Sequence, residues 1–181
     1  KNQLQDNDNS KNHSLRLEYD VLPKLQSGVN DAATKVEGQN ANMFGADISY
    51  HTKLSKLWNA GSNSEFKYGT NVSAFTAATL AGKNISDYKM TGFYIIPFIS
   101  RTINENNKSF VEFTCRYEYL EDVNKNGNIG RFYTPMLSYV IGDDYTSKIS
   151  LVGVISDYSK DIINTIQYSS KLLLLQYQIK F

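Results

Sequence analysis

The sequence has no apolar run long enough for a membrane-spanning helix. Such a helix needs about 18 or more predominantly apolar residues, and the mean hydropathy of the chain is −0.41. This excludes a helical membrane protein but leaves a membrane β-barrel open, because barrel strands alternate apolar and polar residues. No basic, apolar leader precedes Lys1, so we expect a mature chain from which a signal peptide was removed.

The chain also has little net charge, one cysteine and few prolines. The 19 Lys and Arg against 18 Asp and Glu leave a net charge of +1, which gives no basic field to attract nucleic acid. The single cysteine, Cys115, has no second thiol for a disulfide, zinc or iron–sulfur site, and we expect no cofactor. Proline occurs only 3 times, whereas 13 Tyr and 9 Phe suit strands.

Alternation of apolar and polar residues is the main signal that the sequence contains. It is clearest at residues 111–119, where Val111, Phe113 and Tyr117 face away from Glu112 and Glu118. Similar patterns predict strands at residues 14–21, 44–58, 66–75, 131–141, 148–156 and 171–181. Residues 88–101 are apolar on both faces, and Pro97 must lie where a ladder N–H is dispensable. One domain of about eight strands fits the length.

The predicted connections alternate between long and short. Long ones fall at residues 23–39, 78–87, 121–130 and 157–170, and short ones at 59–64, 102–108 and 142–147. Outer-membrane barrels show this asymmetry, with tight periplasmic turns and longer surface loops, and an even strand count brings both termini to the periplasm.

The end of the chain carries the most specific pattern. Apolar residues alternate toward a terminal aromatic residue, at Leu173, Leu175, Tyr177, Ile179 and Phe181. This resembles the C-terminal signal by which bacterial outer-membrane barrels are passed to their assembly machinery. Together with the strand count and loop lengths, residues 13–181 resemble the small barrels typified by OmpX, OmpW and the membrane domain of OmpA. Residues 1–12 are polar, and we expect a flexible periplasmic tail there.

The resemblance implies a closed antiparallel up-and-down transmembrane β-barrel in the bacterial outer membrane. Its partners would be outer-membrane lipid, lipopolysaccharide and the barrel-assembly machinery. The resemblance is architectural, so it assigns no functional residue. A soluble barrel of the lipocalin kind has the same alternation with the faces inverted and remains the competing fold. Aromatic residues near predicted strand ends fit interfacial girdles: Tyr19, Trp58, Phe66, Tyr88, Phe110, Tyr119, Tyr177 and Phe181.

If the apolar face meets lipid, the opposite face points into the barrel. The charged residues in that phase are Arg16, Glu18, Asp20, Asp47, Lys67, Glu112, Arg116, Glu118, Lys148 and Lys180. The interior of an eight-stranded barrel is just wide enough for side chains to fill it. We therefore expect a lumen filled by paired charges and not an open pore.

Two groups of residues have the composition of chemical sites. Asp47, Ser49 and His51 share one strand face, but steps of about 7 Å are too long for direct hydrogen bonds along a strand. Asp122, Asn124 and Asn126 resemble the start of a calcium loop, but the closing Glu is absent, so we favour an Asn-Gly turn without a metal. We predict no catalytic residue.

Function is therefore predicted at the level of class. We expect a non-enzymatic outer-membrane barrel, either a structural surface protein or an accessory subunit of a larger outer-membrane protein complex. The alternatives are a narrow channel or lateral transporter for small hydrophobic molecules, a lipid A-modifying enzyme that would depend on His51, and a soluble carrier.

Overall fold

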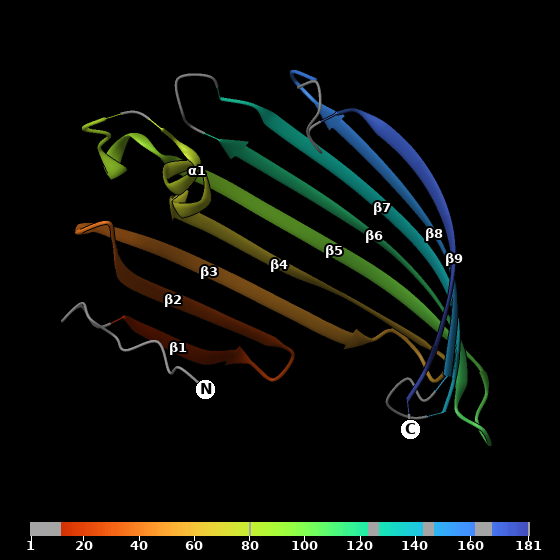
Figure 1. Ribbon diagram of the computed structural model, residues 1–181. Coiled ribbons are helices and arrows are strands. Elements are labelled where there is room, and N and C mark those ends of the chain that lie inside the picture. The colour runs from red at the N-terminus through yellow and green to blue at the C-terminus, as the bar shows by residue number, and fades with distance from the viewer. Residues whose placement is uncertain (1–11, 80, 123–126, 143–146, 162–167, 181) are drawn as a thin grey trace, which may run out of the picture.

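The computed structural model describes residues 12–79, 81–122, 127–142, 147–161 and 168–180, which form one antiparallel sheet (Figure 1). Its nine described strands lie side by side in chain order. They are β1 (His13–Leu22), β2 (Leu25–Val36), β3 (Gln39–Lys53), β4 (Trp58–Thr70), β5 (Lys89–Asn104), β6 (Ser109–Asp122), β7 (Ile129–Ile141), β8 (Ser147–Tyr158) and β9 (Ser170–Ile179). Helix α1 (Val72–Ala77) and the 3-10 turn η1 (Ile85–Asp87) connect β4 to β5. The predicted all-β, up-and-down class is confirmed.

The sheet is not closed, and the predicted closed barrel of eight strands is wrong on both counts. The order runs from β1 at one edge to β9 at the other, and these two strands are not paired with each other. Figure 1 shows the sheet curving into an open trough, with the strongest bend near β9.

The ninth strand is β2, within the segment 23–39 that we predicted to be one long connection. Its outer positions include Ser27 and Asp31, so the apolar alternation that marks the other strands is interrupted. Tertiary pairing with β1 and β3 overrides this weak local signal. A two-residue turn at Glu37 and Gly38 joins β2 to β3, with φ of 50° and 78°, the left-handed geometry that tight hairpins need.

The predicted turn at residues 59–64 is also wrong. These residues lie inside β4, where Asn59 pairs with Ser100 and Ser62 pairs with Pro97. Their small polar side chains are typical of turns, which explains the error. The chain turns earlier, at residues 54–57, where the N–H of Leu54 donates to the carbonyl of Trp58 at 2.9 Å.

The sheet has two distinct ends. The strand pairs β1–β2, β3–β4, β5–β6 and β7–β8 are connected at one end of the sheet, which we call the turn end. The pairs β2–β3, β4–β5, β6–β7 and β8–β9 are connected at the other end, the loop end. The predicted asymmetry holds except for the tight turn at 37–38. Because the described strand number is odd, β1 begins at the loop end and β9 finishes at the turn end, so the expectation of both ends on one side is wrong.

Strand pairing also fixes the phase of β5, which the sequence left ambiguous. Phe93, Ile95 and Ile99 share one face with Phe66 and Phe113, whereas Ile96 and Phe98 point to the other. The ladder between β5 and β6 is interrupted at Ile96 and Pro97, as predicted for a residue without an N–H.

Candidate functional site

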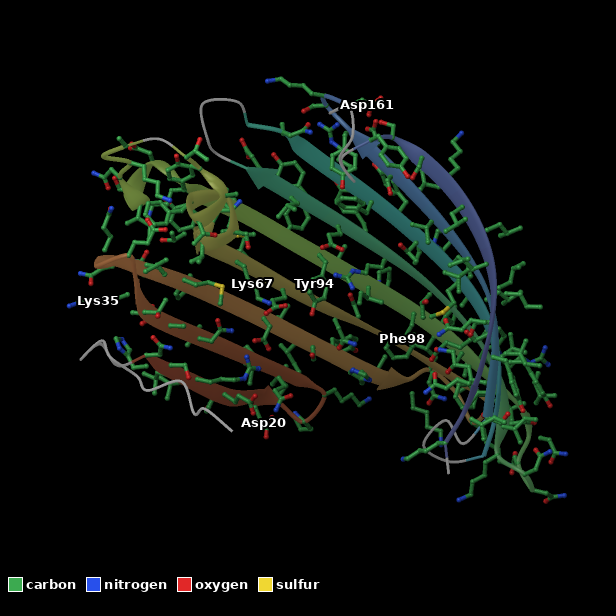
Figure 2. All side chains as sticks on the ribbon, in the orientation of Figure 1. Asp20, Lys35, Lys67, Tyr94, Phe98 and Asp161 are labelled. Atoms are coloured by element: carbon green, nitrogen blue, oxygen red, sulfur yellow. The ribbon has the colours of Figure 1, made fainter. Side chains whose placement is uncertain are left out.

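The two faces of the sheet differ sharply in chemistry, and the hollow one carries the predicted charges. We call it the inner face; Figure 2 shows Lys67, Tyr94 and Phe98 on it. The register places nine of the ten predicted lumen residues there: Arg16, Glu18, Asp20, Asp47, Lys67, Glu112, Arg116, Glu118 and Lys148. The tenth, Lys180, directly follows β9 and is exposed.

The best-formed contact of the inner face joins β1 to β3 across β2. The guanidinium of Arg16 donates through Nη1 and Nη2 to the two carboxylate oxygens of Asp47, at 2.8 and 3.1 Å. Its Nε donates to Oε1 of Glu18 at 2.6 Å. Gly28 lies beneath this cluster, and a Cβ there would approach Arg16 Nη2 and Asp47 Oδ2 to 2.9 Å. With glycine at this position, the fork lies over the strand without having to shift.

Five further inner-face charges also lie close to partners within the wall: Lys67, Glu112, Arg116, Glu118 and Lys148. Lys67 contacts Glu65 at 2.9 Å, and Arg116 contacts Glu118 at 2.8 Å while its guanidinium lies 4.6 Å from the centre of the Tyr94 ring. Lys148 Nζ lies 3.9 Å from Glu112, in the most buried part of the face. Sequence reasoning missed Glu65, because it sits next to the wrongly predicted turn; its i, i+2 spacing to Lys67 was the available signal.

The predicted filled lumen is not present in the open sheet. The side chains of Arg16, Glu18 and Lys67 are about half exposed, and their partners are neighbours along the wall. A hollow of about 350 Å³ lies on the inner face toward the turn end. It is lined by His51, Asn59, Asn63, Ile96, Phe98, Ser100, Thr102, Phe110, Glu112 and Thr114.

The residues considered for chemistry are not brought together. Asp47 is held by Arg16, whereas Nε2 of His51 lies 3.2 Å from Oδ1 of Asn63 and its ring packs on Phe98. The calcium candidates Asn124 and Asn126 lie outside the described residues, as does the side chain of Asp122. In the part of the chain that is described, no three His, Cys, Asp or Glu residues are placed to hold a metal ion.

The opposite, outer face is apolar and exposed. Leu137, Leu151 and Leu175 lie in one row across β7, β8 and β9 and are 52%, 47% and 78% exposed. The central parts of β5 to β9 carry no charge at their outer-face positions, within residues 93–99, 111–119, 133–141, 149–155 and 173–179. Arg131 and Asp157, which pair at 3.5 Å, lie on the outer face at strand ends, whereas Asp31 lies within β2, level with the aromatic residues Phe44 and Tyr68. Four of the predicted C-terminal signal residues, Leu173, Leu175, Tyr177 and Ile179, belong to this face; Phe181 lies outside the described residues.

Aromatic side chains border the outer face toward both ends. Toward the loop end lie Phe44, Phe66, Tyr68, Phe93, Tyr117, Tyr119 and Tyr133, with the Phe93 and Tyr119 rings stacked at 5.5 Å. Toward the turn end lie Tyr19, Tyr50, Trp58, Tyr139 and Tyr177, with Arg101 over the Trp58 ring. Two predicted girdle residues are elsewhere: Phe110 lines the inner hollow, and Tyr88 packs on Phe75.

The distance between the two aromatic borders can be estimated from the length of β5 that lies between them. From Phe93 to Arg101 the strand extends about 26 Å at about 3.3 Å per residue, or about 20 Å along a barrel axis at the usual tilt of about 40°. The apolar band of outer-membrane barrels is about 25 Å tall. The apolar stretch of the outer face along β5 is therefore of similar length, about 20 to 26 Å depending on the tilt.

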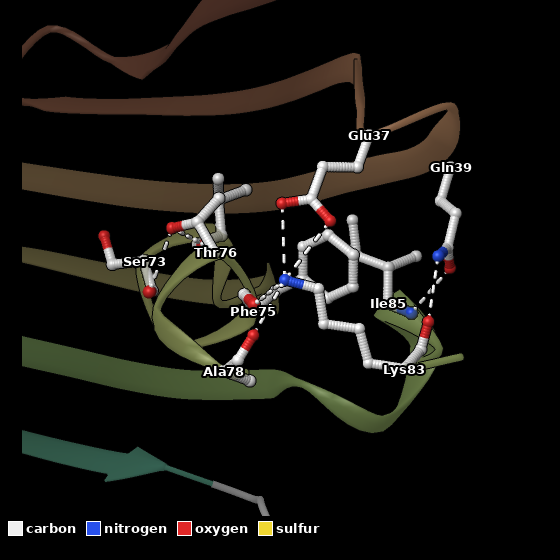
Figure 3. Close-up of polar contacts among 9 residues, drawn as sticks. Glu37, Gln39, Ser73, Phe75, Thr76, Ala78, Lys83 and Ile85 are labelled. Atoms are coloured by element: carbon white, nitrogen blue, oxygen red, sulfur yellow. Dashed lines mark hydrogen bonds and ion pairs between the residues drawn. The ribbon is translucent and has the colours of Figure 1, made fainter. Parts of the chain in front are cut away.

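A small folded cap covers the loop end of β2 and β3. Phe75 and Ile85 bury their side chains against Ala41. Lys83 Nζ donates to the carbonyls of Phe75 and Ala78 and pairs with Glu37 at 3.2 Å, while the Gln39 side chain holds the backbone of Lys83 and Ile85 (Figure 3). The cap is thus fixed to the β2–β3 turn by apolar and polar contacts together.

Comparison with known proteins gives no relative: no family model, no curated protein and no solved structure matches this chain. Within the described residues, no helix is long and apolar enough to cross a membrane. The candidate site is therefore defined by the geometry of the two faces alone.

Proposed function

We propose that this protein is a non-enzymatic outer-membrane β-barrel protein, a structural surface protein or an accessory subunit of a larger outer-membrane assembly. The outer face would contact outer-membrane lipid and lipopolysaccharide. By the usual asymmetry of such barrels, the loop end with its cap would face outward and the turn end the periplasm.

The observation that carries the proposal is the distribution of polarity over the curved sheet. Large apolar side chains such as Leu137 and Leu175 are exposed on the outer face, whereas ion pairs line the inner face. A soluble monomer rarely exposes contiguous apolar patches above a few hundred Å². A lipocalin-like carrier requires the opposite, with apolar residues inside, so the observed polarity argues against it.

Membrane insertion tests the proposal directly. The urea-unfolded chain is diluted into phosphatidylcholine vesicles and floated on a density gradient, and the emission of its single tryptophan, Trp58, is recorded. We expect flotation with the vesicles and a blue-shifted emission, because Trp58 lies on the outer face. Stable folding in buffer without lipid or detergent would refute the proposal.

A second candidate, transport of small hydrophobic molecules, is favoured by one observation. The inner face carries its ion pairs on β1–β8, but a run of apolar residues lies on it at Val152, Val154, Leu172 and Leu174 of β8 and β9. Such a patch suits an alkyl chain. To test this, a fluorescent fatty acid is titrated into the vesicle-inserted protein. Saturable binding that Leu174→Glu abolishes, and that an inserted Leu175→Glu variant keeps, would support transport over a purely structural role.

A further inference from the structure

Both edge strands of the sheet present unpaired backbone groups. β1 is exposed along all ten of its residues, and β9 along nine of ten. In hydrocarbon, an unsatisfied N–H or C=O costs several kcal/mol, and open sheet edges do not occur there. If the sheet lies in a membrane, as the proposed function holds, each edge must pair with another strand.

The direction of the two edge strands restricts how they can pair. In a meander with nine described strands, β1 and β9 both run from the loop end to the turn end. A seam between them is therefore parallel. Parallel pairing is slightly weaker per residue than antiparallel pairing but satisfies the same backbone groups, and membrane barrels with an odd strand number exist.

The side chains of the two edges match in such a seam. Each strand is ten residues long, and each presents apolar residues outward, Leu15 and Leu17 on β1 and Leu175 and Tyr177 on β9. On the inner side, β1 carries Asp20 near the turn end. At the same end β9 is followed by a lysine, Lys180. Opposite charges thus come to the same level of the seam.

The inner face is also built for tight curvature. Its glycines lie on strands between β2 and β7: Gly28, Gly45, Gly61, Gly69, Gly92 and Gly130. At Gly28, Gly45 and Gly61 a Cβ would collide with inner side chains of neighbouring strands. Small residues on the concave side let a sheet bend sharply, as a narrow barrel needs.

The strands are staggered as well. The turn end of β1, at Leu22, is level through β2, β3 and β4 with Pro97 in the middle of β5. The turn end of β9, at Ile179, is level through Ser147 with Ile141, beyond the Thr102 level of β5. Barrel closure requires such a stagger, because the strands tilt against the barrel axis.

We infer that β1 and β9 of one chain pair in parallel in the membrane and close the sheet into a nine-stranded barrel, with Asp20 and Lys180 at the seam. Closure also gathers the half-exposed ion pairs of the inner face into one enclosed lumen. The proposal rests on membrane insertion, and its test reads insertion and closure separately.

Disulfide trapping in vesicles tests the seam. Starting from Cys115→Ser, Leu17→Cys is combined in turn with Leu173→Cys, Leu175→Cys and Tyr177→Cys, the outer positions of β9 that alternation allows beside Leu17. The vesicle-inserted proteins are oxidised with copper phenanthroline and separated on non-reducing gels. The matched control combines Leu17→Cys with Leu137→Cys, which is also on the outer face but on β7 in the middle of the wall.

We expect an intramolecular disulfide in at least one of the three pairs, seen as a faster-migrating monomer, and none in the control. Disulfide-linked dimers would overturn closure in favour of a second copy at each edge. Absence of any cross-link in inserted protein would overturn it in favour of other strands at the edges. If the vesicles float without the protein, the proposed function itself fails, and the seam fails with it.

Discussion

An arginine in the centre of the outer face gives the sharpest test of where this sheet resides. Leu137 lies midway along β7 between Tyr133 and Ile141, beside Phe113 and Leu151, and its side chain points away from the sheet. In lipid, Leu137→Arg puts a charge near the bilayer centre. On outer-membrane barrels such a charge costs about 2–4 kcal/mol at the midplane and about 0–1 near the interfaces.

The predicted magnitude separates the two environments. A loss of about 2–4 kcal/mol lowers the folding equilibrium constant about 30- to 1,000-fold. In water, an exposed surface substitution usually changes stability by less than about 0.5 kcal/mol. The same substitution is therefore severe if the outer face meets lipid and nearly neutral if it meets solvent.

Guanidinium titration of the vesicle-folded protein, followed by Trp58 emission, measures this difference. Ile141→Arg is the matched control, because Ile141 has the same orientation at the turn end of the same strand. We expect Leu137→Arg to lose at least 1 kcal/mol more than Ile141→Arg (about 2–4 against about 0–1). Equal losses at the two positions would refute a lipid-facing outer surface.

Three further predictions concern the inner face and the cap. Gly61→Ala should destabilise the folded protein by about 1–3 kcal/mol, because its Cβ would lie 2.3 Å from the backbone carbonyl oxygen of Tyr50, and more than Gly92→Ala, whose nearest neighbour would lie at 3.3 Å; equal guanidinium midpoints would contradict the crowding. In the vesicle-folded protein, a double-mutant cycle of Arg16→Gln and Asp47→Asn should give a coupling above about 1 kcal/mol, the upper range of exposed pairs, because closure encloses a pair that is half exposed in the open sheet; a smaller coupling would mean that the pair stays open to solvent. Phe75→Ala should loosen the cap, with faster proteolysis within 71–88, while vesicle insertion stays unchanged; loss of insertion would show that the wall depends on the cap.

Much of the wall was predictable because alternation is a local property. The run from Val111 to Tyr119 is inside β6, and the shared face of Leu173, Leu175 and Tyr177 in β9 follows directly from their spacing. The shared face of Arg16, Asp47 and Glu112 was equally readable, because strand alternation fixes which residues lie together once the strands pair in order.

The errors arose where local chemistry and pairing disagree. Residues 25–36 contain Ser27, Asn30 and Asp31, a composition of loops, yet the neighbouring strands hold them as β2. Residues 59–64 read as a turn and lie in the middle of β4. The ion-pair partners could not all be predicted from the sequence either, because the Arg16–Asp47 contact crosses β2 at Gly28.

The sequence by itself determined that this chain forms an antiparallel meander with one apolar and one charged face, because a period of two sorts side chains to opposite sides of any strand. Only the tertiary structure decided that there are nine described strands, that the apolar face is the outer one, and that β1 and β9 are the two edges of the sheet. These depend on hydrogen bonding and curvature between strands distant in sequence, which no local pattern encodes.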